Sequence, residues 1–300
     1  MADLQNTFSW SSSRDKICCE CARRYYWHYY GSWEGWRAIA PEKARLAYRL
    51  KNMTTLKMWA GSVVHETIEA ALRGLRAGKT PNAEETREQA RRALNNGWRQ
   101  SVSGEWRRDP KRALNLFEHY YATPLTADDR AHLREHVFAC IDRFFASEAY
   151  AMLCAAGAGQ WMALEDLQSF TVQGAPVWVK LDAAIRDNGR VVIIDWKTGD
   201  ARESDAEQLG VYALYALSAW KTPPESLEAR LVYLRQGVEN VVRPDSQALI
   251  DERERIGKSI ARMKALLDDA DRNRASMERF AMEDDEQVCV RCSFKELCER

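Results

Sequence analysis

The sequence has no long apolar run, and none of its hydrophobic stretches approaches the ~20 residues that a helix needs to span a bilayer. Its first residues lack a basic start followed by an apolar core, so no secretory signal is expected. The chain carries no excess charge, because 44 basic residues balance 44 acidic ones. We therefore expect a cytoplasmic protein without membrane contact, in which any attraction to phosphate comes from a local patch.

Repeats, low-complexity linkers and a phosphate-binding P-loop are also lacking. Without a P-loop, any ATP-driven helicase activity would have to come from a partner subunit. The chain is nevertheless long enough for a sizeable core, with 300 residues of which 46% are hydrophobic.

The eight cysteines are unevenly distributed. Cys140 and Cys154 stand among apolar residues and are expected to be buried. The others gather near the two ends, which in a cytosolic chain favours a metal or cluster over disulfides. The C-terminal spacing C-x2-C-x5-C suits thiolate ligands, with one distant cysteine as the fourth. A cluster, a zinc site and free thiols all remain open at this point. These end-proximal cysteines are Cys18, Cys19, Cys21, Cys289, Cys292 and Cys298.

The order of the expected elements indicates an α/β protein. Helices dominate up to about residue 158, and short β-rich runs follow. Asp187-Asn188-Gly189 predicts a tight hairpin between two of these runs. Strands are expected at 167–172, 177–185, 190–196, 229–236 and 239–243, and helices at about 204–220, capped by Ser204 or Asp205, and at about 246–280. We expect one integrated domain of three parts, spanning 1–160, 161–245 and 246–300.

Two predicted strands of this region carry acidic residues. Asp195 and Lys197 close an apolar strand and point to the same side, with Trp196 opposite. Asp182, on the preceding strand, is expected to lie beside Asp195. Two close carboxylates repel each other, and Mg²⁺ or Mn²⁺ would relieve that repulsion. Lys197 would orient or deprotonate a water, or stabilise charge on a phosphate. The alternative is a surface ion-pair cluster.

The run VVIIDWKTGD, preceded by LDAAI and followed by Gln208-Leu-Gly-Val-Tyr212, resembles the PD-(D/E)XK nuclease superfamily. It is most similar to the RecB-like branch, which includes CRISPR-associated iron–sulfur exonucleases and AddB-type nuclease domains. The resemblance implies a restriction-endonuclease-like core, in which helices flank a central mixed β-sheet. It assigns Asp182 and Asp195 as metal carboxylates and Lys197 as the catalytic lysine.

Further site residues follow from the same resemblance. Gln208 and Tyr212 match a Q-x-x-x-Y motif that contacts DNA and supports the lysine, and their spacing puts them on one helix face. His65, in a G-x-x-x-H setting, matches another metal ligand, and the carbonyl of Trp196 completes the set. Two further residues are noted: Lys180 stands where the family often has glycine, and Glu165 is a weak acidic candidate.

The cysteine pattern also has a counterpart in this branch. The resemblance implies a [4Fe–4S] cluster that staples the chain ends together through one N-terminal cysteine and the C-terminal triplet. Cys21 fits best, because basic and aromatic residues follow it, but Cys18 and Cys19 are alternatives. Those aromatic residues, from Arg23 to Tyr30, either stack on bases or pack against the core. The expected ligands are Cys21, Cys289, Cys292 and Cys298.

Taken together, these motifs predict a metal-dependent deoxyribonuclease. We expect an exonuclease acting on single-stranded DNA or DNA ends, in repair, recombination or defence, with DNA and a helicase or other DNA-processing subunit as partners. The alternative is a catalytically silent DNA-binding or scaffold subunit, which the intact Asp195-x-Lys197 motif argues against. Cleavage polarity, strand preference, pathway and oligomeric state are not determined by the sequence.

Overall fold

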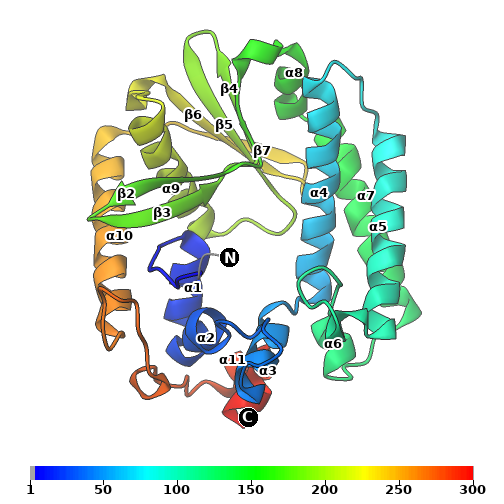
Figure 1. Ribbon diagram of the computed structural model, residues 1–300. Coiled ribbons are helices and arrows are strands. Elements are labelled where there is room, and N and C mark those ends of the chain that lie inside the picture. The colour runs from blue at the N-terminus through cyan, green and yellow to red at the C-terminus, as the bar shows by residue number, and fades with distance from the viewer. Residues whose placement is uncertain (1–3, 300) are drawn as a thin grey trace.

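A computed structural model describes residues 4–299 of the chain (Figure 1). The first half is helical, as expected. Its long helices, α4, α5 and α7, lie alongside one another at the right of Figure 1. The helices of this half are α1 (Ser12–Glu20), α2 (Ala22–Tyr26), the π-helix η1 (Trp27–Gly31), α3 (Glu42–Lys51), α4 (Leu56–Arg76), α5 (Ala83–Ser103), the short 3-10 helix η2 (Glu105–Arg107), α6 (Phe117–Tyr120), α7 (Ala127–Phe145) and α8 (Glu148–Ala155).

A five-stranded mixed sheet forms the centre of the protein, in the order β1-β4-β5-β6-β7. Only β5 and β6 pair in parallel, and the helix α9 (Glu203–Ala219) provides the crossover between them. The strands are β1 (Trp161–Leu164), β4 (Ala183–Asp187), β5 (Arg190–Lys197), β6 (Leu227–Tyr233) and β7 (Val238–Val242), and a separate hairpin consists of β2 (Leu167–Val172) and β3 (Ala175–Lys180).

Alternation along β5 divides the core into two halves. Val191 and Ile193 face one hydrophobic cluster, which includes residues of α9 and α10 (Ser246–Ala265). Val192, Ile194 and Trp196 face a second cluster, built with α4 and α7. Helices therefore cover both faces of the mixed sheet, and the predicted α/β class is confirmed.

The expectation of one strand over 177–185 is wrong. This segment contains two strands in different sheets, and the chain leaves the hairpin at Lys180 and enters the central sheet at Ala183. Asp182 therefore lies in the link between two strands, not in the middle of one. The continuous apolar pattern concealed this break, because β3 buries alternate residues and β4 begins with three buried residues. Strand β1 was also missed.

Two helix limits differ from expectation. The helix predicted over 246–280 ends at Ala265, and the following residues form turns and the short 3-10 helix η5 (Met277–Arg279). The helix α9 begins after Arg202, and Asp205 accepts the backbone N–H of Arg202 from within the first turn. Asp205 thus supports the helix start without being its N-cap.

The early helices α2 and α3 lie beside the short C-terminal helix α11 (Glu286–Val290) at the lower end of Figure 1. A third hydrophobic cluster joins Trp27 of η1 and Leu50 of α3 to Phe294, which follows α11. Within residues 4–299, no helix combines the length and the apolarity that crossing a membrane requires.

The hairpin turn between β4 and β5 provides a test of this register. Asn188 and Gly189 both have positive φ, at 46° and 80°, as a tight hairpin requires. Open space surrounds the position of a Cβ on Gly189. We expect Gly189→Ala to lower the free energy of unfolding by about 1 kcal/mol through backbone strain alone, as measured by urea denaturation.

Gly159→Ala is the matched control for that substitution. Gly159 also has open space around its Cβ position, but its φ is not in the left-handed region. Its free energy of unfolding should stay within about 0.5 kcal/mol of wild type. Equal losses in the two variants would contradict the turn.

Candidate active site

Two acidic residues meet where β1 ends and β4 begins. The backbone N–H of Glu165 donates to the carbonyls of Leu181 and Asp182, at 2.9 and 3.1 Å, which fixes the two side chains next to each other. Glu165 has a φ of 54°, a strained conformation for a residue with a Cβ. Both side chains are buried, so the sheet edge holds two carboxylates with little access to water.

His65 joins this pair from helix α4. Its Nδ1 lies 3.4 Å from Asp182 Oδ1 and 3.5 Å from Glu165 Oε1. Gly61, one turn earlier, permits the close approach, because a Cβ there would lie 3.0 Å from the Thr198 hydroxyl. Ligand atoms of His65, Glu165 and Asp182 all fall within 4.8 Å of one another, a spacing suited to a single metal ion.

Cationic side chains of the protein face each carboxylate at this edge. Burial lowers the pKa of His65, but the carboxylates of Asp182 and Glu165 outweigh burial and raise it to about 10. Among residues 4–299, Glu165 Oε1 and Asp195 Oδ2 are buried and accept no hydrogen bond of good geometry, although His65 Nδ1 and Lys197 Nζ lie 3.5 and 2.7 Å from them. Carboxylate oxygens of this kind fit a cation, which would replace the proton on His65.

Asp195 lies beside this cluster at the end of β5. Its neighbour Trp196 donates a backbone N–H to Asp182 Oδ2 at 2.9 Å, which ties the two aspartates to one sheet edge. Burial and the nearby Asp182 carboxylate raise the pKa of Asp195 to about 6, although Lys197 opposes the shift. The structure therefore brings together the aspartates that the sequence predicted to be close.

Lys197 is held by a chain of polar contacts. Its Nζ lies 2.7 Å from Asp195 Oδ2 and donates to Gln208 Oε1 at 2.6 Å. The Gln208 amide donates to the Tyr212 hydroxyl, which in turn donates to the Lys180 carbonyl at 2.9 Å. The i,i+4 pair on α9 thus fixes the position of the lysine from β5.

Lys180 does not extend freely into solvent. Its Nζ lies 2.6 Å from Glu165 Oε2, while the backbone of the same residue accepts from Tyr212. Glu165, only a weak candidate from the sequence, is thereby placed at the centre of the site. Little in the sequence indicated this role, because the position of Glu165 depends on the pairing of β1 with β4.

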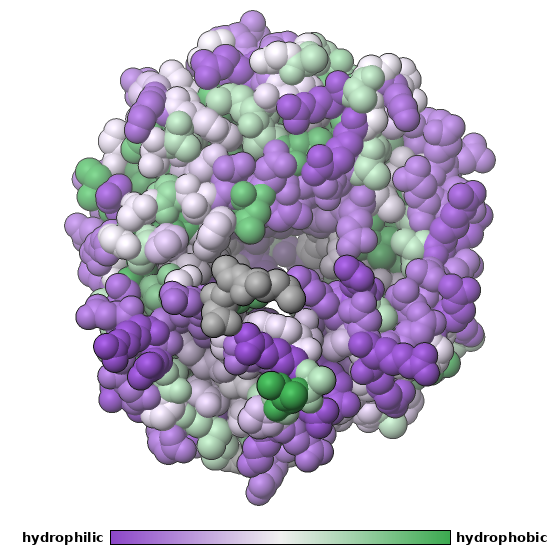
Figure 2. Space-filling model, viewed as in Figure 1, coloured by the Kyte–Doolittle hydropathy of each residue, from purple (hydrophilic) through white to green (hydrophobic). Residues whose placement is uncertain are grey.

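These residues line a cleft of about 1210 Å³ between the central sheet and helices α1, α4 and α10. Figure 2 shows a hollow near the centre of the molecule, bordered largely by hydrophilic residues. In the described part of the chain, Lys16, Lys57 and Arg202 line this cleft without a carboxylate partner within 4.0 Å. The cleft thus has free cations near its acidic edge, despite the zero net charge of the chain.

A second candidate site lies where the two chain ends meet. Cys21, Cys289, Cys292 and Cys298 line one small cavity. The backbone N–H groups of Arg24 and Phe294 donate to sulfurs of two of these cysteines, each at 3.4 Å. Burial raises the pKa of Cys292 to about 11, so its thiolate form needs a positive partner.

The other cysteines lie elsewhere. Cys18 is buried in the core cluster of the sheet, and Cys19 contacts Asp15 and Arg262. Cys140 is buried as expected, but Cys154 is exposed and its predicted burial is wrong. The reason is that Cys154 sits on the outward side of the short helix α8.

The aromatic run after Cys21 mainly packs inward. Tyr25 and Trp27 are buried, and Tyr25 contacts the rings of Tyr29 and Phe280. This favours core packing over base stacking for the buried members. Glu69, one turn beyond His65, pairs with Arg73 at 2.7 Å.

Comparison with models of known families matches residues 9–299 to the PD-(D/E)XK nuclease superfamily. The match spans both chain ends and all the residues described above. A search of curated proteins finds no match.

The acidic edge predicts a metal-binding defect. Glu165→Gln keeps the shape of the side chain but removes the charge, and should weaken Mn²⁺ binding at least about tenfold by calorimetry. Glu69→Gln is the control, since Glu69 lies on the same side of the protein but is paired with Arg73. Unchanged Mn²⁺ affinity in a folded Glu165→Gln variant would show that Glu165 is not a ligand.

Proposed function

The chain belongs to the PD-(D/E)XK nuclease superfamily, and on that basis we propose that it is a metal-dependent deoxyribonuclease of the RecB-like branch. One observation carries the proposal. His65, Glu165 and Asp182 converge within 4.8 Å, directly beside the Asp195–Lys197 pair, in a large cleft. A phosphodiester hydrolase needs such a cation site and a fixed lysine in one accessible space.

The donor set fits a divalent cation. We propose Mg²⁺ or Mn²⁺ as the ion, held by His65, Asp182, Asp195 and the carbonyl of Trp196, with Glu165 as a further ligand. Carboxylate oxygens dominate this set, which suits these hard cations. When bound, the ion supplies a Lewis acid that makes water more acidic and offsets phosphate charge.

The protein side chains then divide the remaining work. Lys197, held between Asp195 and Gln208, presents its ammonium group at the acidic edge and stabilises negative charge that develops on the phosphate. Gln208 and Tyr212 are positioning residues, because they fix Lys197 through hydrogen bonds. Lys16, Lys57 and Arg202 attract the DNA backbone to the cleft.

We propose that the cysteine cavity holds a [4Fe–4S] cluster that joins the chain ends. One N-terminal cysteine and a C-terminal triplet line this cavity together, which is the four-thiolate set that such a cluster needs. Its role is structural, since it links the start of α2 to α11 and the residues that follow it.

The finer properties are proposals on the same basis. We propose exonuclease action on single-stranded DNA or DNA ends, in repair, recombination or defence. We also propose that the protein acts in the cytoplasm, with a helicase or other DNA-processing subunit as its partner. The three parts of the chain act as one domain, because motifs from all three meet at the cleft or at the cysteine cavity.

The decisive test is cleavage of end-labelled DNA. Purified protein should degrade it with Mn²⁺ or Mg²⁺ and not with chelator, and Asp195→Ala or Lys197→Ala should lower the rate at least about 10³-fold. Asp187→Ala, at the far end of the same strand pair, should cleave like wild type. A folded, metal-loaded protein without activity would point to the DNA-binding or scaffold role.

The cluster has its own test. Anaerobically purified protein should be brown and contain about four iron atoms per chain, and Cys21→Ser should lose most of this iron. Cys18→Ser and Cys19→Ser should retain it, because these residues lie outside the cavity. One zinc per chain in a colourless protein would overturn the cluster.

A further inference from the structure

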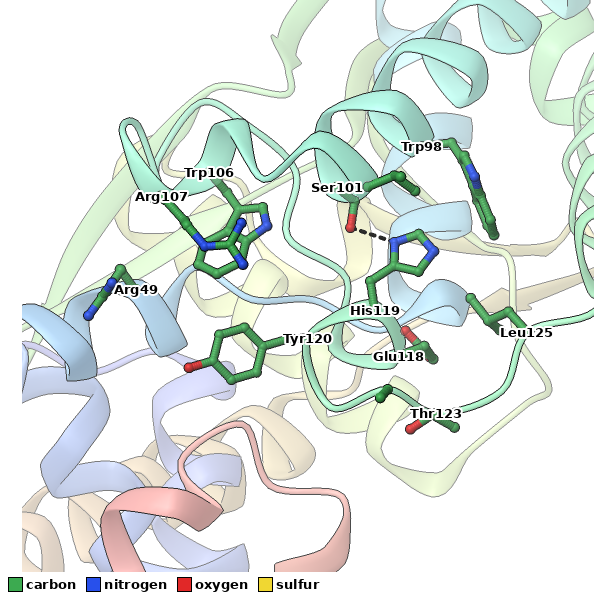
Figure 3. Close-up of a pocket in the computed structure, with 12 residues that line it drawn as sticks. Arg49, Trp98, Ser101, Trp106, Arg107, Glu118, His119, Tyr120, Thr123 and Leu125 are labelled. Atoms are coloured by element: carbon green, nitrogen blue, oxygen red, sulfur yellow. Dashed lines mark hydrogen bonds between the residues drawn. The ribbon is translucent and has the colours of Figure 1, made fainter.

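A second cavity, of about 760 Å³, lies between α3, α5 and α6, apart from the acidic edge. Figure 3 shows its aromatic and basic lining. Three aromatic side chains contribute: Trp98 of α5, Trp106 of η2 and Tyr120 of α6. The cavity is within the usual size range for a small-ligand site of roughly 300–1,000 Å³.

The aromatic rings are held in place by contacts with one another and with neighbouring side chains. Trp98 meets the ring of His119 edge-on at 4.7 Å, and Trp106 lies 5.4 Å from Tyr120. The Tyr120 hydroxyl donates to Glu296 at 2.7 Å, and His119 Nδ1 is engaged by Ser101. Rings fixed in this way can receive a flat partner without losing side-chain freedom.

Two cations at this cavity lack a carboxylate. Arg107 lies over the Trp106 ring at 4.4 Å, and within residues 4–299 neither Arg107 nor Arg49 forms an ion pair. The Nε of Arg49 is buried without a hydrogen-bond partner. The one acidic lining residue, Glu118, is already used, since both its oxygens accept the backbone N–H of Leu56. Arg107 and Arg49 are therefore available to bind an anion.

A basic groove of about 310 Å³ continues from the cavity on the other side of Trp98. Arg130 and Arg134 line it, both exposed, and Arg130 lies 5.2 Å from the Trp98 ring. Neither has a carboxylate partner among the described residues. Aromatic rings alternating with free arginines are the pattern that holds unpaired bases and their phosphates.

One segment of the catalytic cleft also contacts the lining of this cavity. Thr54, Lys57 and Met58 border the cleft. Leu56, in the same segment, donates its backbone N–H to the carboxylate of Glu118, which lines the cavity.

We propose that this cavity binds an unpaired nucleobase and its phosphate from the strand that occupies the catalytic cleft. The inference rests on the proposed function, and it specifies the substrate as DNA with a single-stranded segment. A base in a duplex cannot enter such a cavity, because both its faces are stacked and its edge is paired. Trp98 and Tyr120 contact the base, while Arg107 and Arg49 contact the phosphate.

The test measures binding without cleavage, so that it does not depend on the nuclease reaction. A fluorescently labelled single-stranded oligonucleotide is titrated with anaerobically purified protein in the absence of divalent metal. Arg107→Ala should weaken binding about tenfold and reduce the slope of log affinity against log salt by about one. Arg108→Ala is the matched control, since this exposed neighbour does not line the cavity and should bind like wild type.

Cross-linking locates the base independently. An oligonucleotide with 5-iododeoxyuridine, irradiated in the complex, should attach to Trp98 or Tyr120, and a duplex of the same sequence should not. Equal affinities of the Arg107→Ala and Arg108→Ala variants, or cross-links confined to other segments, would overturn the proposal and favour a peptide partner for the cavity. Failure of DNA cleavage alone would count against the nuclease and leave these binding results intact.

Discussion

The side chains of the site are arranged around three buried carboxylates that repel one another at one sheet edge. Glu165, Asp182 and Asp195 are brought there by strands that must end together, and burial makes each charge costly. Cations face these charges: Lys180 pairs with Glu165, and Lys197 pairs with Asp195. His65 of helix α4 lies beside Asp182 and Glu165, and one oxygen each of Glu165 and Asp195 accepts no hydrogen bond of good geometry.

The surrounding fold keeps this unfavourable arrangement rigid. The apolar strand β5 is buried between two hydrophobic clusters, so its polar end cannot shift without disturbing the core. Helix α9 then fixes Lys197 through Gln208 and Tyr212. The Tyr212 hydroxyl donates to the backbone carbonyl of Lys180, which precedes Asp182 by two residues. Such a site has little freedom to relax when a substrate phosphate arrives, which is a property that electrostatic catalysis requires.

Aromatic and basic residues have different roles on different surfaces of this protein. Tyr25 and Trp27, close to Cys21, serve packing at the joined chain ends. Trp98, which is partly exposed, instead lines a cavity with unpaired arginines. The sequence does not separate these cases, because a run such as ARRYYW is as compatible with a nucleic-acid surface as with a core. Burial and the availability of ion-pair partners separate them.

The sequence by itself determined the apolar strand β5, the turn at Asn188-Gly189, the crossover helix and the spacing of Asp195, Lys197, Gln208 and Tyr212, because all of these follow from local periodicity and short-range geometry. The break at Asp182, the position of Glu165 beside it and the meeting of Cys21 with the C-terminal cysteines in one cavity were decided only by the tertiary structure. Each depends on segments far apart in the chain, namely β1 beside β4 and the N-terminal helices against the C-terminal triplet. The local sequence pattern of one segment does not predict which distant segment will pack against it. Contacts of this kind are therefore determined by the packing of the whole chain.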